Sequence, residues 1–160
     1  MADVSVTLRE IDENNWMDVV LLTTSGEKEP KVLEEYVASN AVSICQALYE
    51  ETWITRAIYC GAKPVGFAMY GYNTERSEYE LCRLMIDKNH QGKGIGSIAL
   101  SLCLDELFSI DDCDSVYLQV HRDNERAKHI YRRYGFSDTG ESTGDEQIYV
   151  LNEKDRKDRR

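Results

Sequence analysis

The sequence predicts an α/β fold in which one twisted, mixed and mostly antiparallel sheet is flanked by helices. Two observations carry this prediction: strand-like segments are concentrated before residue 90, and strand and helix patterns alternate after it. The length of 160 residues fits a single domain with its own core. We expect that domain to span residues 1–151, followed by a charged tail over residues 152–160 that is solvated.

The first third of the chain predicts one strand and two helices. Apolar and polar residues alternate over residues 4–11, as in a half-buried strand, and residues 14–23 follow as a short helix. Apolar residues recur at helical spacing over residues 31–51. The Ser39 and Asn40 pair inside that stretch is expected to break it into two pieces.

The middle of the chain is rich in β-formers. Residues 54–60 and 65–70 flank the turn GAKP, which predicts a hairpin. Residues 79–87, YELCRLMID, predict a third strand beside it. Side chains alternate along a strand, so we expect Glu78, Glu80, Cys82 and Leu84 on one face and Tyr79, Leu81, Arg83 and Met85 on the other.

The last third of the chain alternates between helices and strands. Residues 95–108 are apolar on nearly all sides, the pattern of a covered helix. Residues 115–121 predict a strand, residues 124–134 a helix that Gly135 ends, and residues 147–151 a last strand.

Composition narrows the possible partners and the compartment. The net charge of −10 repels nucleic acid and favours cationic partners. The number of cysteines is odd, and their spacing fits neither a disulfide framework nor a metal site, so a reducing cytoplasm is expected. No apolar run is long enough to span a membrane, and the first residues lack a signal-peptide pattern.

The stretch HQGKGIG has glycines at positions 92, 94 and 96, between the strand that ends near Asp87 and the helix that starts near Ile95. Backbone N–H groups at such a strand-to-helix turn form a phosphate-binding geometry. The spacing is neither that of a P-loop nor that of the dinucleotide fingerprint. A tight turn without a ligand remains the other interpretation.

Two motifs together resemble the GNAT family of N-acetyltransferases. The loop signature of that family is Gln or Arg, two residues of any type, Gly, one residue of any type, and Gly or Ala, which Gln91 to Gly96 match in full. Its second signature resembles NERAKHIYRRYGF, with matches at Asn124, Ala127, Tyr131, Gly135 and Phe136. Residues 57–140 further resemble bacterial spermidine/spermine N-acetyltransferases.

The resemblance implies a GNAT-like fold, acetyl-CoA as cosubstrate, and roles for particular residues. Tyr131 would protonate the CoA thiolate as it leaves, and backbone donors of residues 84–86 would polarise the thioester carbonyl. The implied acetyl-CoA-binding residues are Leu84, Met85, Ile86, Gln91, Gly92, Lys93, Gly94, Ile95, Gly96, Ser97 and Asn124. Dimers are frequent in this family, so a homodimer is also expected.

The acceptor amine must lose a proton before it attacks, because an alkylammonium has a pKa of about 10.4. Relatives commonly carry an acidic residue where this chain has Cys82. We therefore assign the base or amine-binding carboxylate to Glu80, with a solvent-facing strand residue as the alternative. Cys82 has no activating histidine at a recognisable position, which favours a buried structural thiol over an acyl carrier.

The sequence thus predicts an acetyl-CoA-dependent transfer to a primary amine of a small polyamine or diamine, by direct attack in a ternary complex. Two alternatives stay open: a protein or peptide N-acetyltransferase, and a non-catalytic sensor that binds acyl-CoA. No metal ligand set is predicted, no role is assigned to His90, and neither nucleic acid nor a membrane is expected as a partner.

Overall fold

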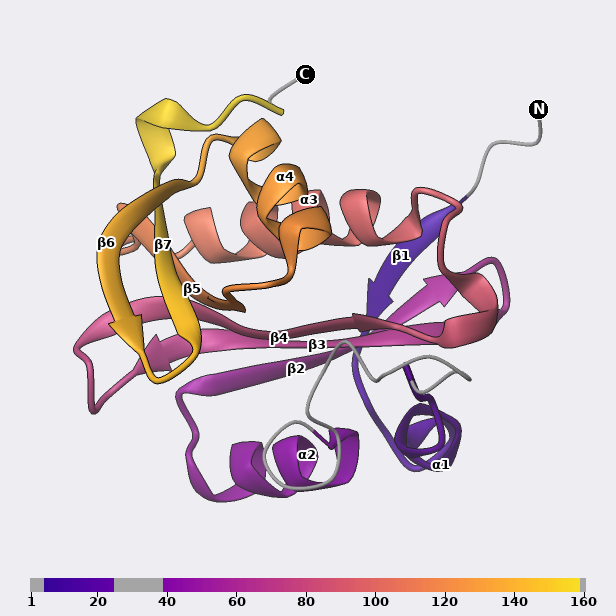
Figure 1. Ribbon diagram of the computed structural model, residues 1–160. Coiled ribbons are helices and arrows are strands. Elements are labelled where there is room, and N and C mark those ends of the chain that lie inside the picture. The colour runs from indigo at the N-terminus through magenta and orange to yellow at the C-terminus, as the bar shows by residue number, and fades with distance from the viewer. Residues whose placement is uncertain (1–4, 25–38, 159–160) are drawn as a thin grey trace.

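The structure is a computed structural model that describes residues 5–24 and 39–158 (Figure 1). Its strands are β1 (Val6–Arg9), β2 (Trp53–Cys60), β3 (Lys63–Asn73), β4 (Glu78–Ile86), β5 (Ser115–His121), β6 (Ser137–Thr143) and β7 (Glu146–Asn152). Its helices are α1 (Trp16–Val20), α2 (Asn40–Tyr49), α3 (Ile95–Phe108) and α4 (Glu125–Tyr134), with short 3-10 turns η1 (Lys88–His90) and η2 (Glu153–Asp155).

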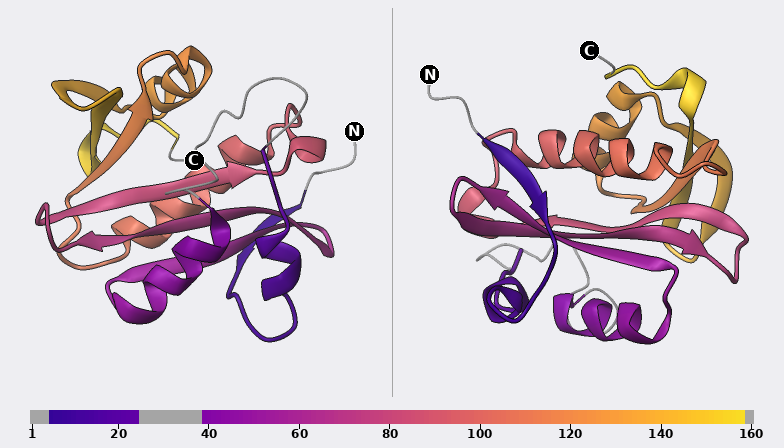
Figure 2. Two further views of the ribbon diagram at one scale, coloured as in Figure 1. Left: turned by 60° about the horizontal axis from the view of Figure 1, so that its bottom comes forward. Right: turned by 180° about the vertical axis from the view of Figure 1, so that it is seen from behind.

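All described strands form one sheet in the order β1-β2-β3-β4-β5-β7-β6. Only β4 and β5 pair in parallel, and every other neighbouring pair is antiparallel. Helices α3 and α4 cover one face, and α1 and α2 cover the other, as the view from behind also shows (Figures 1 and 2). The predicted fold class, a mixed and mostly antiparallel sheet flanked by helices, is confirmed.

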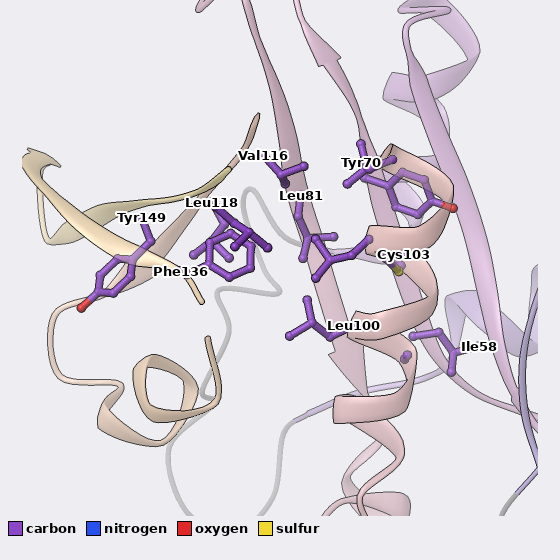
Figure 3. Close-up of a cluster of buried hydrophobic side chains, with 14 of the residues drawn as sticks. Ile58, Tyr70, Leu81, Leu100, Cys103, Val116, Leu118, Phe136 and Tyr149 are labelled. Atoms are coloured by element: carbon purple, nitrogen blue, oxygen red, sulfur yellow. The ribbon is translucent and has the colours of Figure 1, made fainter. Parts of the chain in front are cut away.

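The larger of two apolar cores lies between the sheet and α3. Helix α3 is buried along most of its length, which agrees with its nearly uniform apolar sequence. Figure 3 shows Leu100 and Cys103 of this helix facing Leu81, Val116 and Leu118 of the central strands. The smaller core, under α1 and α2, includes Phe67 and Met85. Both faces of the central strands are therefore fixed by packing.

Most predicted elements are present, and α3 and β5 have the predicted bounds. The predicted hairpin is formed by β2 and β3. Strand β1 and helix α1 are shorter than predicted, and Ser39 caps α2 through its hydroxyl, which accepts from the N–H of Val42. The parts of the predicted elements at residue 4 and residues 31–38 lie outside the described residues.

Strand β6 was not predicted, because its sequence SDTGEST has no apolar residue. Every residue of β6 is exposed, and the strand pairs only with β7 at the edge of the sheet. Its backbone pairing, rather than burial of side chains, holds it in place. A periodicity search for a half-buried strand cannot detect such a segment.

The predicted alternation along β4 is wrong beyond Cys82. Met69 pairs with Arg83 and Tyr70 with Leu81, so Cys82 is an extra residue that faces no partner on β3. This β-bulge shifts the pattern by one residue. Leu84 therefore packs on the α3 side, together with Tyr79 and Leu81, and Met85 packs on the opposite side, as does Cys82.

The predicted solvated tail is in contact with the domain over residues 152–158. Arg156 is the clearest case, because only 5% of its side chain is exposed. Its guanidinium forms ion pairs with Asp105 on α3 (2.8 Å) and with Asp158 (2.5 Å). Sequence composition indicated solvation because nearly every residue is charged, but the burial of the Arg156 side chain departs from that expectation, while Lys154, Asp155 and Lys157 are exposed. Residues 159–160 lie outside the description.

Within the described part of the chain, no helix has the length and apolar character needed to cross a membrane. The five cysteines, Cys45, Cys60, Cys82, Cys103 and Cys113, are free thiols. Cys103 and Cys113 are buried, whereas Cys45 is exposed.

Gly135 should be far less replaceable than Gly140, although both have a positive φ, +106° and +81°. A Cβ at Gly135 would lie 2.3 Å from the backbone oxygen of Asp155, whereas one at Gly140 meets nothing within 4 Å. We expect Gly140→Ala to cost about 1–2 kcal/mol of unfolding free energy from φ alone, and Gly135→Ala about 1–3 kcal/mol more from the clash. Urea unfolding of both variants measures this difference, and equal costs would contradict the close approach.

Candidate functional site

Strands β4 and β5 separate shortly after they meet. Their parallel pairing joins Tyr79 to Val116 and Glu80 to Tyr117. Beyond Glu80, no described strand pairs with β4 on the β5 side, although β4 continues to Ile86. A cavity of about 200 Å³ lies at this end of β4, between the first turns of α3 and α4.

The structure brings nearly all predicted acetyl-CoA-binding residues to this cavity. Residues from the end of β4, the glycine loop and the starts of α3 and α4 line it: Leu84, Met85, Ile86, Gln91, Gly92, Gly94, Ile95, Gly96, Ser97 and Asn124. Lys93 is the exception, because it is exposed and its Nζ donates to the carbonyl of Asn89 at 3.2 Å.

The glycine loop has the backbone geometry that only glycine adopts easily. Gly92 and Gly94 have φ of +79° and +78°, and a Cβ at either position would meet nothing within 4 Å. Gly94 is the N-cap of α3, so the first N–H groups of that helix have no partner within the helix. An anion at this position would accept hydrogen bonds from those N–H groups and would be stabilised by the positive end of the helix dipole.

The loop is fixed to the end of β4 by two side chains. Gln91 donates through Nε2 to the carbonyl of Ile86 at 2.9 Å. Asp87 accepts hydrogen bonds from the backbone of Asn89, from Thr23 and from His90. Burial alone would raise the pKa of Asp87, but these hydrogen bonds lower it below its usual value. The carboxylate therefore stays charged and holds the turn before the glycines.

Helix α4 supplies the opposite wall of the cavity. Asn124 is its N-cap, and its Oδ1 accepts from the N–H of Ala127 at 3.1 Å. Beneath it, the buried Lys128 donates to the carbonyl of Arg122 and to Oε1 of Gln147 (3.2 Å), which fixes the turn between β5 and α4. Asn124 is therefore held at the cavity by capping rather than left free.

Sequence reasoning missed several lining residues: Thr24, His90, Arg126, Ala127 and Ile130. Arg126 could have been found, because a cation in the first turn of the helix after Asn124 lies close to any anion at this site. His90 directly precedes the loop motif, which assigns no role to that position. Thr24 comes from a distant segment, and nothing local in the sequence indicates its contact with the loop.

Tyr131 is half-buried and packs edge-on against Phe136, with ring centroids 5.7 Å apart. It follows Ile130, the last α4 residue of the lining, and is not itself among the described residues that line the cavity. Burial raises the pKa of Tyr131 to about 12, so its hydroxyl keeps its proton at neutral pH. Among the described residues, none forms a hydrogen bond with this hydroxyl, which leaves its proton available to a ligand.

Glu80 is buried, with 5% of the residue exposed, so the solvent-facing alternative is wrong. Its carboxylate accepts a hydrogen bond from Nδ2 of Asn73 at 2.8 Å, and Nε2 of Gln119 lies 3.5 Å from its other oxygen. The residue stands where β4 and β5 separate. Its two amide partners hold the carboxylate in place.

Cys82 lies two residues beyond Glu80, at the bulge. Burial raises the pKa of its thiol to about 11, and the carboxylates of Glu80, Glu50 and Glu146 add to the effect. Nη1 of Arg83 lies 3.0 Å from its sulfur. A thiol with so high a pKa is protonated at neutral pH, as expected for a structural cysteine rather than an acyl-carrying nucleophile.

These features form two parts: a backbone anion cradle at the start of α3, and the buried carboxylate of Glu80, which is not among the described residues that line the cavity. In the described residues, no group of three or more His, Cys, Asp or Glu side chains could hold a metal ion. The arrangement suits a ligand that has a phosphate-rich end in the cradle and an extended arm along the unpaired edge of β4.

Comparison with known proteins identifies the family. Spermine/spermidine N(1)-acetyltransferase of Bacillus subtilis is 28% identical over 144 residues, which cover 86% of this chain and 91% of that protein. N-alpha-acetyltransferase RimI of Mycobacterium tuberculosis is 35% identical over 89 residues, 51% of this chain and 53% of that protein.

A solved structure shares the fold. The crystal structure of spermidine N-acetyltransferase from Vibrio cholerae in complex with CoA and spermine matches with a TM-score of 0.72 at 18% identity, covering 94% of this chain and 96% of that one. Residues 16–136 match the acetyltransferase (GNAT) family. The resemblance seen in the two sequence motifs is thus confirmed, and the chain belongs to the acetyltransferase (GNAT) family.

Proposed function

We propose that this protein transfers the acetyl group of acetyl-CoA to a primary amine of a small polyamine or diamine such as spermidine or spermine. Membership of the family makes acetyl-CoA the cosubstrate. The observation that carries the proposal is the cavity that joins the glycine cradle to the unpaired edge of β4. The polyamine as acceptor is supported by the named activity of the Bacillus relative and by the net charge of −10.

In this proposal, the chain binds the pyrophosphate of acetyl-CoA through the first N–H groups of α3, with Arg126 nearby as a counter-charge. The backbone of Leu84 to Ile86 binds the arm that carries the thioester. Its N–H groups polarise the thioester carbonyl. Acetyl-CoA itself supplies an acyl group activated for attack by an amine.

The chain must also move two protons. Only about one alkylamine in 2,500 is neutral at pH 7, given a pKa of about 10.4, so the acceptor has to be deprotonated first. Glu80 accepts that proton, or holds the ammonium until water removes it. The hydroxyl of Tyr131 donates a proton to the departing CoA thiolate. Both steps occur while acceptor and acetyl-CoA are bound together, so no acyl-enzyme is formed.

We also infer a cytoplasmic setting. Five free thiols suit a reducing cytoplasm, where thiols stay reduced. A polyamine acceptor also suits an acidic protein, because its ammonium groups are attracted by the general negative field.

Gly94→Val should weaken acetyl-CoA binding at least about tenfold, or about 1.4 kcal/mol. The reason is that a side chain would fill the open cradle and strain a φ of +78°. Gly140→Val is the matched control, because Gly140 has a similar φ of +81° and a Cβ there also meets nothing within 4 Å, but it is not among the described residues that line the cavity. Calorimetric titration gives both affinities, and thermal unfolding shows that each variant is folded. Equal affinities in the two folded variants would refute the cradle assignment.

Tyr131→Phe should lower kcat by about 10²- to 10⁴-fold while acetyl-CoA affinity stays within about threefold. The substitution keeps the ring that packs on Phe136 and removes only the proton donor. Stopped-flow measurement of thiol release gives kcat, and calorimetry gives the affinity. An unchanged kcat would remove Tyr131 from the mechanism, and joint loss of folding and binding would show that the tyrosine has a packing role.

The acceptor class can be tested by the salt dependence of KM. The KM for spermidine or spermine should rise steeply between 0.1 M and 1 M salt, because the screening length falls from about 10 Å to about 3 Å. The KM for a monoamine of similar length should change less, because it carries one charge. Thiol release with spermine, spermidine, putrescine, lysine, an aminoglycoside and a peptide as acceptors gives the comparison.

Glu80→Gln should reduce the preference for polyamines over the monoamine in the same panel, because the amide keeps the shape and loses the charge. Equal salt dependence for both acceptors, or a preference for the peptide, would exclude the polyamine as acceptor and leave the family assignment intact. Absence of thiol release with every acceptor would instead favour a non-catalytic acyl-CoA sensor.

A further inference from the structure

The segment that follows the last strand is bound to α3 by one buried arginine. Nη2 of Arg156 donates to the carbonyl and the hydroxyl of Ser101, at 3.1 and 3.2 Å, besides its ion pair with Asp105. Asp158 completes the contact, because its carboxylate accepts from the hydroxyl of Ser101 and from Arg156. The buried guanidinium of Arg156 thus has three side-chain partners, Ser101 and Asp105 on α3 and Asp158 in the segment itself.

The same segment is also bound to the last turn of α4. The N–H of Lys157 donates to the carbonyl of Tyr134 at 3.1 Å, and the Asp155 carbonyl packs against the Cα side of Gly135, which has no Cβ. Residues 153–158 therefore touch both helices at once, and they hold the end of α4 against α3. This segment lies beyond residue 136, where the match to the family ends.

Tyr134 connects this contact to the acetyl-CoA cavity. Its hydroxyl donates to the carbonyl of Ser97 at 2.6 Å. Ser97 lies in the first turn of α3 and lines the cavity, and Ile130, one turn before Tyr134, lines the opposite wall. This hydrogen bond therefore joins α4 to α3 next to the cavity that lies between them.

We propose that Tyr134 and the docked segment of residues 153–158 set the affinity for acetyl-CoA, because together they fix the distance between the two helices that wall its cavity. Tyr134 and Arg156 are positioning residues in this scheme and touch no ligand. When the contact is lost, α4 samples positions in which the cavity is too wide, and the apparent affinity falls in proportion to the remaining competent fraction. The inference rests on the proposed placement of acetyl-CoA in this cavity.

Tyr134→Phe tests the scheme, and Tyr70→Phe, which also removes a tyrosine hydrogen bond to α3, is its matched control. Tyr70 donates its hydroxyl to Glu106, near the other end of α3, and neither residue is among the described lining of the cavity. We expect Tyr134→Phe to raise the Kd for acetyl-CoA about 3- to 10-fold, with kcat at saturation nearly unchanged. Tyr70→Phe should leave the Kd within about twofold although it also lowers the unfolding temperature. Equal Kd values for the two variants would overturn the proposal.

Arg156→Met provides a second variant that leaves Tyr134 intact. Because either substitution alone releases the contact that holds α4 against α3, the double variant Arg156→Met with Tyr134→Phe should raise the Kd by less than the product of the two single effects. Full multiplication of the effects would mean that the two residues act independently, and would refute a common mechanism.

Linkage gives a test on the unmodified protein. If docking of the segment favours binding, binding must favour docking to the same extent. Saturating acetyl-CoA should therefore slow hydrogen exchange of the Lys157 amide, which donates to Tyr134, by about the same factor by which Tyr134→Phe raises the Kd. Unchanged exchange would contradict the scheme.

Weakened binding in Gly94→Val with no effect in Tyr134→Phe would refute this inference alone. Normal binding in Gly94→Val would instead refute the proposed placement of acetyl-CoA.

Discussion

The rest of this structure depends on where strands β4 and β5 stop pairing. A strand in the interior of a sheet normally satisfies its backbone on both sides, and an unpaired buried edge is costly. Here the parallel pairing ends at Glu80, while β4 continues to Ile86 with β3 as its partner on the other side. The open edge, the glycine loop that follows β4 and the start of α4 after β5 all converge on one space. A ligand with amide groups of its own can complete the edge that none of the described strands completes.

Two electrostatic effects of different range act on this space. The net charge of −10 produces a field that extends over a Debye length and attracts polycations. The cradle at Gly94 acts over the length of a hydrogen bond, through N–H groups with no partner within the helix. An acidic protein can therefore bind an anionic cosubstrate, because the short-range donors outweigh the unfavourable field at contact. Arg126 at the cavity adds local counter-charge to those donors.

The parts of the fold that depend on local patterns could be predicted from the sequence. Helix α3 has its predicted bounds because its apolar run begins directly after the glycine loop and ends before the next predicted strand. The residues of the loop signature meet at the cavity because they are neighbours in the chain. Lys93 is the exception, since a lysine between two glycines of positive φ is free to turn outward.

The remaining features depend on contacts between distant residues, which no local pattern records. The bulge in β4 depends on how β3 pairs with it, so Leu84 and Met85 exchange the faces that strict alternation assigns. The hydrogen bonds to Glu80 come from Asn73 and Gln119 on the two neighbouring strands. The burial of Arg156 depends on Ser101 and Asp105, more than fifty residues earlier. Because of the bulge, Cys82 has no partner on β3 with which its side chain would have to pack. Under the proposed role of Glu80, replacement of the Cys82 side chain would alter the chemistry next to the acceptor without disturbing strand register, so acceptor preference would diverge at this position while the fold is inherited unchanged.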